Sequence, residues 1–524
     1  MSEAPHVTVA GGGLAGLTAA LRLAQRGYRV KLYEKEDVLG GDLRSRHEDG
    51  VEIDVYPHMY LSWYGNFWRL LEEVTGEDRN TRFRPFRTVK QLRRGEFPKF
   101  TEVGNAQSVT ALWRNVFSGV GSPADMFLFA YATVDLLAER LNPTMSLDDM
   151  SVNGFLRSRP YMTEGAAAAC DAFITRVWAI RSYLTSADDY LEFLEYNMAE
   201  PTPTFSLARG PASRQVIEPL KAALERAGVE MVCNTPVTSV SYTDGRVTEI
   251  GLGDGRSEEV DELILAVPEA ALLDLVRSGK SGHRIVEALP RLAEVSRLQT
   301  QRIPIVNLYF KRKLRHIPAE PVGLFGSELA LAFTDISQTW EGMPGFDVTV
   351  LSLSSSDLYG LPGTDDDDDA MAMLRELAEY LDFDPGERWG QSSDIDWKRT
   401  KFHSNADATL FINETGTDIW RPPAACDGIE NLTLAGDFCA NRIGMTVIES
   451  AVTGGLDAAR VIVERRGLGR PVEIDEPDSG FAPMYVWLRY AWAPYAAAAK
   501  VWSSGSDWVD SMRHLLTPTR PPGR

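Results

Sequence analysis

Hydrophobic positions near the start of the chain change from one spacing to another within residues 6–33. Residues 6–10, His-Val-Thr-Val-Ala, are rich in β-branched side chains, which is typical of a buried strand. Residues 17–25 carry apolar side chains at helical spacing, and Gly27 is expected to end that helix. Residues 29–33 again indicate a strand. This order predicts a strand–turn–helix–strand unit, which is typical of an α/β fold with a parallel sheet.

The same patterns recur along the chain and predict more strands and a group of helices. Asp244-Gly245 lies between two β-rich runs and indicates a hairpin. Strands are predicted at residues 228–237, 238–242, 246–252, 262–268, 303–310, 329–333 and 346–353, and helices at residues 123–141, 165–180, 188–198 and 370–381. We therefore expect an α/β domain interleaved with a domain of mixed sheet and helices.

Composition narrows the class of protein. The 524 residues carry 54 Lys and Arg against 74 Asp and Glu, a net charge of −20, and 44% of them are hydrophobic. This length and hydrophobic content predict an ordered protein of more than one domain. The negative charge argues against nucleic acid as a partner and against electrostatic docking to anionic lipid.

Other features of the sequence indicate a cytoplasmic protein without a metal. The four cysteines are widely spaced without a CxxC pair, and we find no secretory leader and no uncharged apolar run long enough to cross a bilayer. The acidic run at residues 365–369 is interpreted as a solvated loop that leads into a helix, with a cation site as the alternative. No residue set has the spacing of a metal site, so no metal is expected.

The turn after the first strand carries the strongest chemical signal. Gly11, Gly13 and Gly16 form a GxGxxG motif, and Glu34 ends the second strand 18 residues beyond Gly16. Such glycines permit a tight turn, backbone approach to a diphosphate and close helix–strand packing. Glu34 can accept hydrogen bonds from a ribose and repels a 2′-phosphate, which favours FAD or NAD over NADP. The predicted dinucleotide-binding residues are Gly11, Gly13, Leu14, Ala15, Gly16, Glu34 and Lys35.

A glycine pair, Gly40 and Gly41, follows this acid. The pair, together with the spacing from Gly16 to Glu34, resembles the FAD-dependent amine oxidase and phytoene desaturase superfamily. The resemblance implies that FAD is the cofactor and that the glycine pair lies over it.

The residue after the glycine pair departs from this family. The family usually has Arg there, whereas this chain has Asp42. Arg44 or Arg46 is expected to take over the contact with the diphosphate, and Arg44 is the residue we assign to the cofactor site.

A second motif begins with Trp-Arg-Pro at residues 420–422 and continues in residues 431–451. Residues 431–438 predict a strand that ends in Ala-Gly-Asp, and a helix is predicted from about Met445. This resembles the closing motif of the same family, in which the Asp contacts the cofactor and the helix N-terminus points at the flavin. The resemblance also places Val237 near the adenine end. The cofactor-binding residues that it implies here are Gly436, Asp437, Gly444, Met445 and Thr446.

The resemblance implies a two-dinucleotide-binding-domain, Rossmann-like flavoprotein whose FAD-binding domain is split. Its expected parts are residues 1–75, 205–285 and 415–470. A substrate domain is expected at residues 76–204 and 286–414, and an aromatic helical tail at residues 471–524. We find no second GxGxxG, so NADPH, a candidate hydride donor, is expected to reach the flavin transiently through the substrate cavity.

Residues 52–64 follow the glycine pair where this family places a segment that passes the flavin. Pro57 and His58 are therefore assigned to the cofactor site. His58 and Tyr60 are the candidate catalytic residues, as proton carriers in an aromatic cavity wall. The alternative is that the aromatic side chains pack the core and that His58 has only a structural role.

The tail is rich in aromatic side chains from Phe481 to Trp502, and Trp508 follows. An aromatic helix pair is predicted, with Arg489 and Lys500 extending their charges to water. Three interpretations stay open: a helix docked on the core, a peripheral membrane contact, and a lid over the cavity.

The resemblance implies an FAD-dependent oxidoreductase that transfers hydride between flavin N5 and a long, apolar polyene, a lipophilic small molecule. Residues 54–68 look most like desaturase homologues that tailor polyene tetramate macrolactams in actinobacteria, where reduction leads to ring closure. Two alternatives stay open: a flavin amine oxidase, which uses a lysine-bound water, and a non-catalytic FAD-binding or escort protein.

Overall fold

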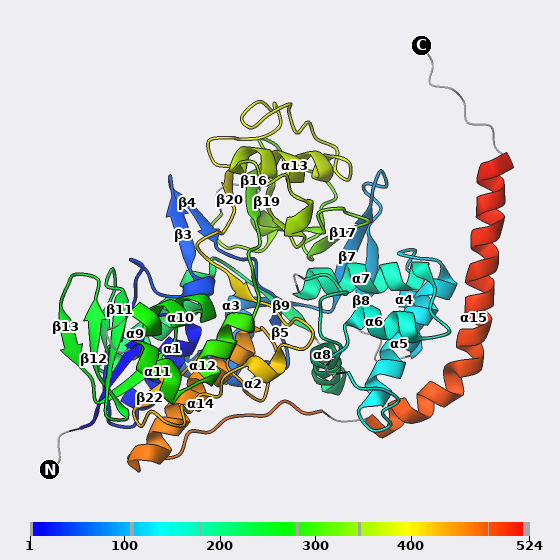
Figure 1. The fold of residues 1–524 in the computed structure, drawn as a ribbon. Helices are drawn as coiled ribbons and strands as arrows, with labels where there is room; N and C mark the ends of the chain where they lie inside the picture. Colours follow the sequence, from blue (N-terminus) through cyan, green and yellow to red (C-terminus); the bar gives the residue numbers. More distant parts are fainter. Residues whose placement is uncertain are drawn as a thin grey trace.

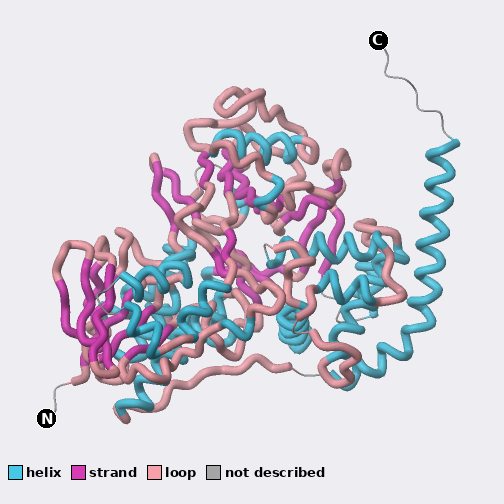
Figure 2. The backbone as a smooth tube through the Cα atoms, viewed as in Figure 1, coloured by secondary structure: helices cyan, strands magenta, loops and turns pink. Residues whose placement is uncertain are grey.

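The computed structural model describes residues 4–104, 109–147, 149–178, 180–202, 204–278, 282–343, 347–479 and 482–516. Figure 1 shows three parts: a parallel sheet with its helices, an antiparallel sheet at the top, and a group of helices beside a long C-terminal helix. Figure 2 shows that strands concentrate in the first two parts and that helices dominate the third. The predicted α/β class is confirmed.

A five-stranded parallel sheet is the centre of the first part. Its strand order is β10-β2-β1-β14-β22. The strands are β1 (His6–Ala10), β2 (Arg29–Tyr33), β10 (Glu230–Val232), β14 (Glu262–Leu265) and β22 (Leu432–Leu434). Three segments that lie far apart in the sequence therefore form one sheet. The exact boundaries of the predicted domains stay a prediction.

The two faces of this sheet carry different layers, because successive side chains of a strand point to opposite faces. Ile264 packs with α1 (Leu14–Ala24) and α14 (Ile448–Arg466) on one face. Leu263 and Leu265 pack on the other face. The elements of that second face are β11 (Val237–Thr243), β12 (Arg246–Leu252), β13 (Ser257–Glu259), α10 (Glu269–Ser278), α11 (Gly282–Ala288) and α12 (Arg291–Glu294).

A seven-stranded sheet forms the second part, with strand order β20-β16-β19-β18-β17-β7-β8. The strands are β7 (Thr88–Arg93), β8 (Thr101–Gly104), β16 (Ile305–Tyr309), β17 (Val322–Phe325), β18 (Leu331–Asp335), β19 (Val350–Ser355) and β20 (Lys401–His403). The predicted strands around β16, β18 and β19 are confirmed, although residue 346 lies outside the described residues. All pairs are antiparallel except β7 with β17.

Helix α13 (Asp366–Ala378) covers this sheet and contains most of the acidic run. The interpretation of that run as a loop is wrong, because Asp366 to Asp369 form the first helical turn. Asp365 caps the helix, since its carboxylate accepts the N–H of Asp368 at 2.8 Å. Acidic side chains at a helix N-terminus are favourable because the helix dipole is positive there.

The third part consists of five helices and the long helix α15 (Ala482–Leu516), which packs along α5. The five are α4 (Val109–Val116), α5 (Pro123–Glu139), α6 (Val152–Ser158), α7 (Glu164–Trp178) and α8 (Ala187–Ala199). The predicted helix pair in the tail is wrong: the tail is one 35-residue helix that contains Pro494. Phe481 and the side chain of Trp508 lie outside the described residues.

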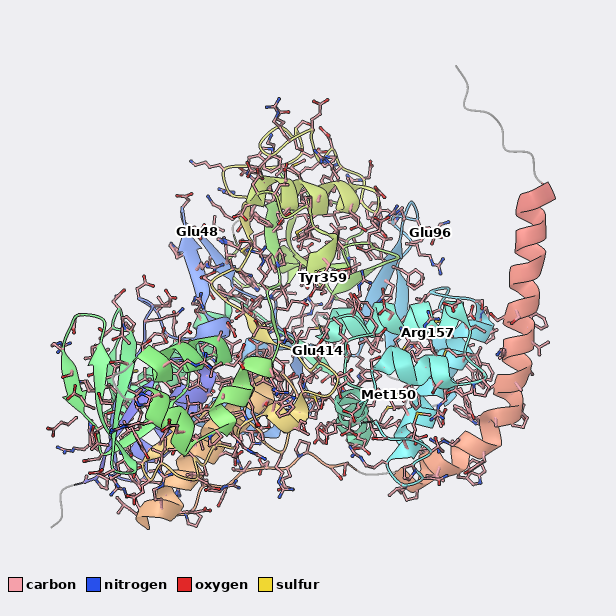
Figure 3. All side chains as sticks on the ribbon, in the orientation of Figure 1. Glu48, Glu96, Met150, Arg157, Tyr359 and Glu414 are labelled. Atoms are coloured by element: carbon pink, nitrogen blue, oxygen red, sulfur yellow. The ribbon has the colours of Figure 1, made fainter. Side chains whose placement is uncertain are left out.

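Short elements connect the three parts. They are β3 (Ser45–Glu48), β4 (Val51–Asp54), β5 (Tyr60–Leu61), β6 (Phe83–Phe86), β9 (Phe205–Ala208), β15 (Thr300–Gln301), β21 (Leu410–Phe411) and α3 (Arg79–Arg82). Helices α2 (Gly65–Thr75) and α9 (Glu218–Arg226) pack with α14 and α1 in the first part. Hairpin β3–β4 projects upward with Glu48 near its tip, and Glu414 lies between the parts (Figure 3). Among the described residues, no helix is long and apolar enough to span a bilayer.

Candidate cofactor and substrate site

The glycine turn after β1 leaves a cradle at the start of α1. Gly11 has φ 110°, which favours glycine. A Cβ on Gly16 would lie 2.1 Å from the carbonyl oxygen of Gly11, so helix and turn touch. At Gly13, in contrast, a Cβ would meet only the Cα of Gly41 at 3.9 Å. The space beside Gly13 and the helix N-terminus is the arrangement that a dinucleotide diphosphate requires.

Glu34 organises this turn from the end of β2. Its carboxylate accepts the N–H of Gly12 at 2.6 Å and the N–H of Glu36 at 2.9 Å. The side chain is buried beside the cradle, where a ribose hydroxyl can also reach it. Lys35 points to solvent and pairs with Glu36 at 3.4 Å. Val237, the first residue of β11, is half-buried next to the turn that follows β10.

The glycine pair closes over this cradle. The N–H of Gly40 donates to the carbonyl of Gly12 at 2.8 Å, and a Cβ on Gly41 would lie 3.0 Å from the Cα of Gly13. Arg44 donates to the carbonyl of Gly41 at 2.9 Å.

Both arginines that were proposed to contact the diphosphate form ion pairs with another residue. Arg44 and Arg46 bind the carboxylate of Asp407, at 3.0 Å and 2.8 Å. Arg44 is nevertheless buried next to Asp42 and acts on it electrostatically. The position that carries Arg in the family is thus occupied by a carboxyl group without a direct guanidinium partner among the described contacts.

The loop between β22 and α14 is held by a buried arginine that the sequence did not single out as a site residue. Arg421 is 2% exposed, and its guanidinium donates to the backbone carbonyls of Asp437 at 2.8 Å and of Cys439 at 2.9 Å. It also donates to the carbonyls of Phe438 and Gly444. One side chain therefore fixes both ends of the loop that carries Gly436, Asp437 and Gly444.

Asn413 holds the next part of this loop. Its side-chain oxygen accepts the N–H of Thr446 at 2.7 Å, and its amide donates to the carbonyl of Gly444 at 3.1 Å. Met445 is fully buried. The predicted helix start at about Met445 is wrong, because α14 begins at Ile448. The preceding residues form a turn in which Gly444 and Thr446 bind Asn413.

Three acidic side chains follow strands or the glycine pair at the carboxyl edge of the parallel sheet and influence one another electrostatically. Asp42 follows the glycine pair, Glu269 opens α10 after β14, and Asp437 follows β22. Burial, together with repulsion from Asp437, raises the pKa of Asp42 to about 7. Burial, with repulsion from Asp437 and Asp42, raises the pKa of Glu269 to about 8. Burial also raises the pKa of Asp437.

A pocket lies where the β4–β5 segment meets the seven-stranded sheet. His58 and Tyr60 line it from one side, and strands β16, β18 and β19 line it from the other; their catalytic role stays a prediction. The full lining is Asp54, Pro57, His58, Tyr60, Leu207, Ala208, Asn307, Thr334, Ile336, Thr339, Trp340 and Ser352. The pocket therefore joins a segment that follows the glycine pair to the second sheet.

Several polar groups of this pocket have no hydrogen-bond partner in the part of the chain that the structure describes. His58 Nδ1, the Tyr60 hydroxyl and Asn307 Oδ1 are buried without a hydrogen-bond partner among the described residues. Burial lowers the pKa of His58 to about 4 and raises that of the Tyr60 hydroxyl, so both are neutral at pH 7. Burial also raises the pKa of Asp54 to about 7. Unpaired buried polar atoms cost free energy, which a polar ligand can recover.

Comparison with known proteins places these features in one family. Residues 14–463 match the model of the family described as flavin containing amine oxidoreductase. A carotenoid phi-ring synthase from Streptomyces griseus is 26% identical over 486 residues, which cover 89% of each chain. A 15-cis-phytoene desaturase from Synechococcus elongatus is 23% identical over 489 residues, 89% of this chain and 99% of the relative.

Solved structures share the fold. An oxidoreductase from Methanosarcina mazei superposes with a TM-score of 0.61 at 16% identity, covering 86% of this chain and 99% of that one. The family match begins within the glycine turn, after Gly13, and extends through the substrate region to the second motif. The chain belongs to the family of flavin containing amine oxidoreductases, and it is an FAD-dependent oxidoreductase of the phytoene desaturase and amine oxidase superfamily.

Proposed function

We propose that this enzyme transfers hydride between bound FAD and a carbon of a long polyene that also carries oxygen or nitrogen groups, with a polyene tetramate macrolactam as the candidate. The family and the two relatives named for carotenoid reactions support a polyene substrate. The observation that carries the more specific proposal is the polar lining of the pocket at His58 and Tyr60.

The residues around the glycine turn fit FAD. The open space at Gly13 takes the diphosphate, Glu34 takes a ribose, and Asp437 and Gly444 lie on the loop that follows β22 at the same edge of the sheet. When bound, FAD supplies a ring that accepts or gives a hydride at N5. The protein itself holds this ring, excludes water from the substrate, and donates or accepts one proton.

A polar pocket favours an oxygenated polyene over a plain hydrocarbon. His58 Nδ1, the Tyr60 hydroxyl and Asn307 Oδ1 lack hydrogen-bond partners among the described residues, and a hydrocarbon would leave all of them unpaired. A site that is built for hydrogen bonds rejects a ligand that cannot make them. Amide and ketone groups of a tetramate can pair with these atoms, while the polyene runs along the apolar side chains.

Proton transfer at the pocket is assigned to two side chains. The Tyr60 hydroxyl stays protonated, since burial raises its pKa, and can donate. His58 is neutral at pH 7, since burial lowers its pKa to about 4, and its free Nδ1 can accept. Asp54 lies in the same pocket with a pKa raised to about 7 by burial, so it can exchange a proton near neutrality.

The experiment compares two polyenes on the FAD-loaded enzyme. We expect turnover of a polyene tetramate macrolactam, monitored by loss of its long-wavelength absorbance, and at least tenfold slower turnover of phytoene. Asn307→Leu should narrow this ratio, because it removes one unpaired acceptor. Equal or faster turnover of phytoene by the wild type would refute the proposed substrate.

NADPH is proposed as the hydride source if the polyene is reduced. It would reach FAD through the same pocket, since we find no second glycine motif in the sequence. Anaerobic bleaching of the flavin band by NADPH supports this direction, and absence of bleaching favours desaturation. The amine oxidase alternative is weaker because the pocket lining includes no lysine; Lys311 donates to the carbonyl of Ser393 at 3.0 Å.

The exposed face of α15 is proposed as a membrane contact. Met484, Trp487, Tyr490, Tyr495, Val501 and Trp502 are 47–76% exposed, and Figure 1 shows the helix along the outer edge of the molecule. Arg489 does not extend to solvent as expected, because it is buried and pairs with Asp135 at 2.7 Å. Lys500 is half-buried and donates to the carbonyl of Pro160.

The described part of α15 thus presents aromatic rings and turns its cations toward the protein. A face of Trp and Tyr without charge suits the interface of a neutral bilayer, whereas protein interfaces usually have a polar rim. The net charge of −20 also disfavours anionic lipid.

A further inference from the structure

The acid group at the sheet edge, formed by Asp42, Glu269 and Asp437, lies where the family holds the diphosphate of FAD. Strands β1, β14 and β22 are neighbours in register, so Gly11, Glu269 and Asp437 follow three adjacent strands. An isolated bridge pairs Gly13 with Gly40, which brings Asp42 to the same edge. Parallel strands that end at one edge place their following residues around the same ligand.

Glu269 has a feature that a helix-capping acid does not explain. Its side chain is only 3% exposed, and its Oε1 is buried without a hydrogen-bond partner among the described residues. The charges that reach it are those of Asp437 and Asp42, both negative. A buried carboxylate among like charges is unfavourable, whereas a protonated carboxyl group there can donate a hydrogen bond.

The cations near the group are engaged elsewhere. Arg44 and Lys35 act on Asp42 from a distance, Asp407 opposes them, and the guanidinium of Arg44 is bound to that same Asp407. Arg421 acts on Asp437, but its donors are directed at backbone carbonyls. The group therefore offers no free guanidinium to a diphosphate, although a diphosphate carries two negative charges.

We infer that Asp42 and Glu269 bind the diphosphate of FAD as protonated carboxyl groups, which donate hydrogen bonds in place of the arginine that the family usually has. Binding FAD then consumes protons: carboxylate plus a proton from solvent gives the carboxyl group that donates to a diphosphate oxygen. This inference rests on FAD binding and not on the identity of the polyene. The pKa values of about 7 and about 8, raised mainly by burial, support it.

Two independent measurements test it on the full-length apoprotein with added FAD. Calorimetric titration at pH 8 in phosphate and in Tris gives the number of protons taken up, and we expect one to two for each FAD bound. Between pH 7 and 9 the Kd should rise about tenfold for each pH unit and each deprotonating group.

Matched variants separate this role from folding. Asp42→Asn and Glu269→Gln keep the donor without the charge, so each should bind FAD at pH 8.5 at least as tightly as the wild type and take up one proton fewer. Glu414→Gln is the control, because burial also raises the pKa of Glu414 but the residue lies outside the group. It should leave the proton count unchanged. Circular dichroism confirms that each variant is folded.

The inference is overturned if the wild type binds FAD without proton uptake or with a Kd that is constant from pH 6 to 9. It is also overturned if Mg²⁺ tightens binding by the wild type and abolishes the uptake, because a bridging cation would then neutralise the acids. Failure to act on any polyene would refute the proposed function and leave both FAD measurements interpretable.

Discussion

The guanidinium of Arg421 donates a hydrogen bond of 2.8 Å to the backbone carbonyl of Asp437, and the same side chain reaches the carbonyl of Gly444. A side chain that lies 16 residues before Asp437 in the sequence thus holds the loop at the cofactor. The arginine is 2% exposed, so its charge is satisfied almost entirely by backbone dipoles and the adjacent Asp418.

Replacing Arg421 with Met keeps much of the volume and removes the donors. Several buried carbonyls then lose their partners, at about 1–3 kcal/mol each before the loop relaxes. We expect the melting temperature to fall by several degrees and the FAD affinity to fall at least tenfold. Thermal unfolding and fluorescence titration with FAD measure the two effects.

Arg421→Lys is the matched control because it keeps the charge but cannot reach all the carbonyls at once. We expect an intermediate loss. Wild-type affinity in the Met variant would show that the loop does not depend on this clamp.

Gly13 and Gly16 offer a comparison between cofactor binding and folding. A Cβ at Gly13 meets nothing closer than 3.9 Å, so Gly13→Val should fold as an apoprotein and fail to bind FAD, because the side chain fills the cradle. A Cβ at Gly16 lies 2.1 Å from a carbonyl, so Gly16→Ala should lose stability itself. The flavin absorbance of each purified variant and its melting temperature distinguish the two outcomes. A yellow Gly13→Val protein would contradict the assignment of the cradle.

The stability of the apoprotein should fall as pH rises from about 4 to 8. Asp42, Asp54 and Glu269 have raised pKa values of about 7, 7 and 8, so the folded state holds protons that the unfolded state releases near pH 4. Their contribution is fully present below pH 4 and is lost as pH passes through these values. His58 acts in the opposite direction, since its lowered pKa costs stability as pH falls from 6.5 toward 4.

Urea unfolding of the apoprotein at several pH values checks this prediction. Asp54→Asn should flatten the loss above pH 6, because the amide cannot ionise. A stability that rises from pH 6 to 8 in the wild type would contradict the protonated state of these groups.

Trp487→Ser with Trp502→Ser should weaken binding to phosphatidylcholine vesicles at least tenfold in a flotation assay. Tyr359→Ser is the control, because Tyr359 is 80% exposed and lies away from α15 (Figure 3). Binding should depend little on salt, since Arg489 is buried in an ion pair and the half-buried Lys500 donates to a backbone carbonyl. The membrane contact would be refuted if the wild-type protein does not float with the vesicles. It would also be refuted if the wild type forms a dimer that the double variant does not form.

The glycine turn could be predicted because its signal lies within one short segment of the sequence. The residues that support the site through long-range contacts could not be predicted. Strands β1 and β2 and the acid at Glu34 follow from spacing and side-chain type within one short segment. Arg421 and Asn413 escaped prediction as site residues because they bind backbone carbonyls and amides, which no side-chain pattern records. Asn307 reaches the pocket only through the register of the second sheet.

Other differences also have physical causes. A helix pair was predicted in the tail, but α15 continues through Pro494 and is held on α5 by the ion pair of Arg489 with Asp135. Helix α14 begins at Ile448, later than predicted, because the residues before it form a turn that binds Asn413. Glu269 could not be predicted as a site residue from the sequence, because its place in the acid group depends on Asp42 and Asp437, which lie 227 and 168 residues away.

An anaerobic single-turnover experiment tests the central claim most directly. Enzyme loaded with FAD is mixed without oxygen with one equivalent of a polyene tetramate macrolactam, either directly or after reduction by NADPH, and both chromophores are followed. The account predicts that flavin and polyene bands change together with equal stoichiometry in one of the two directions. Polyene that stays unchanged in both, with flavin reduced instead by a primary amine or by nothing, would contradict it.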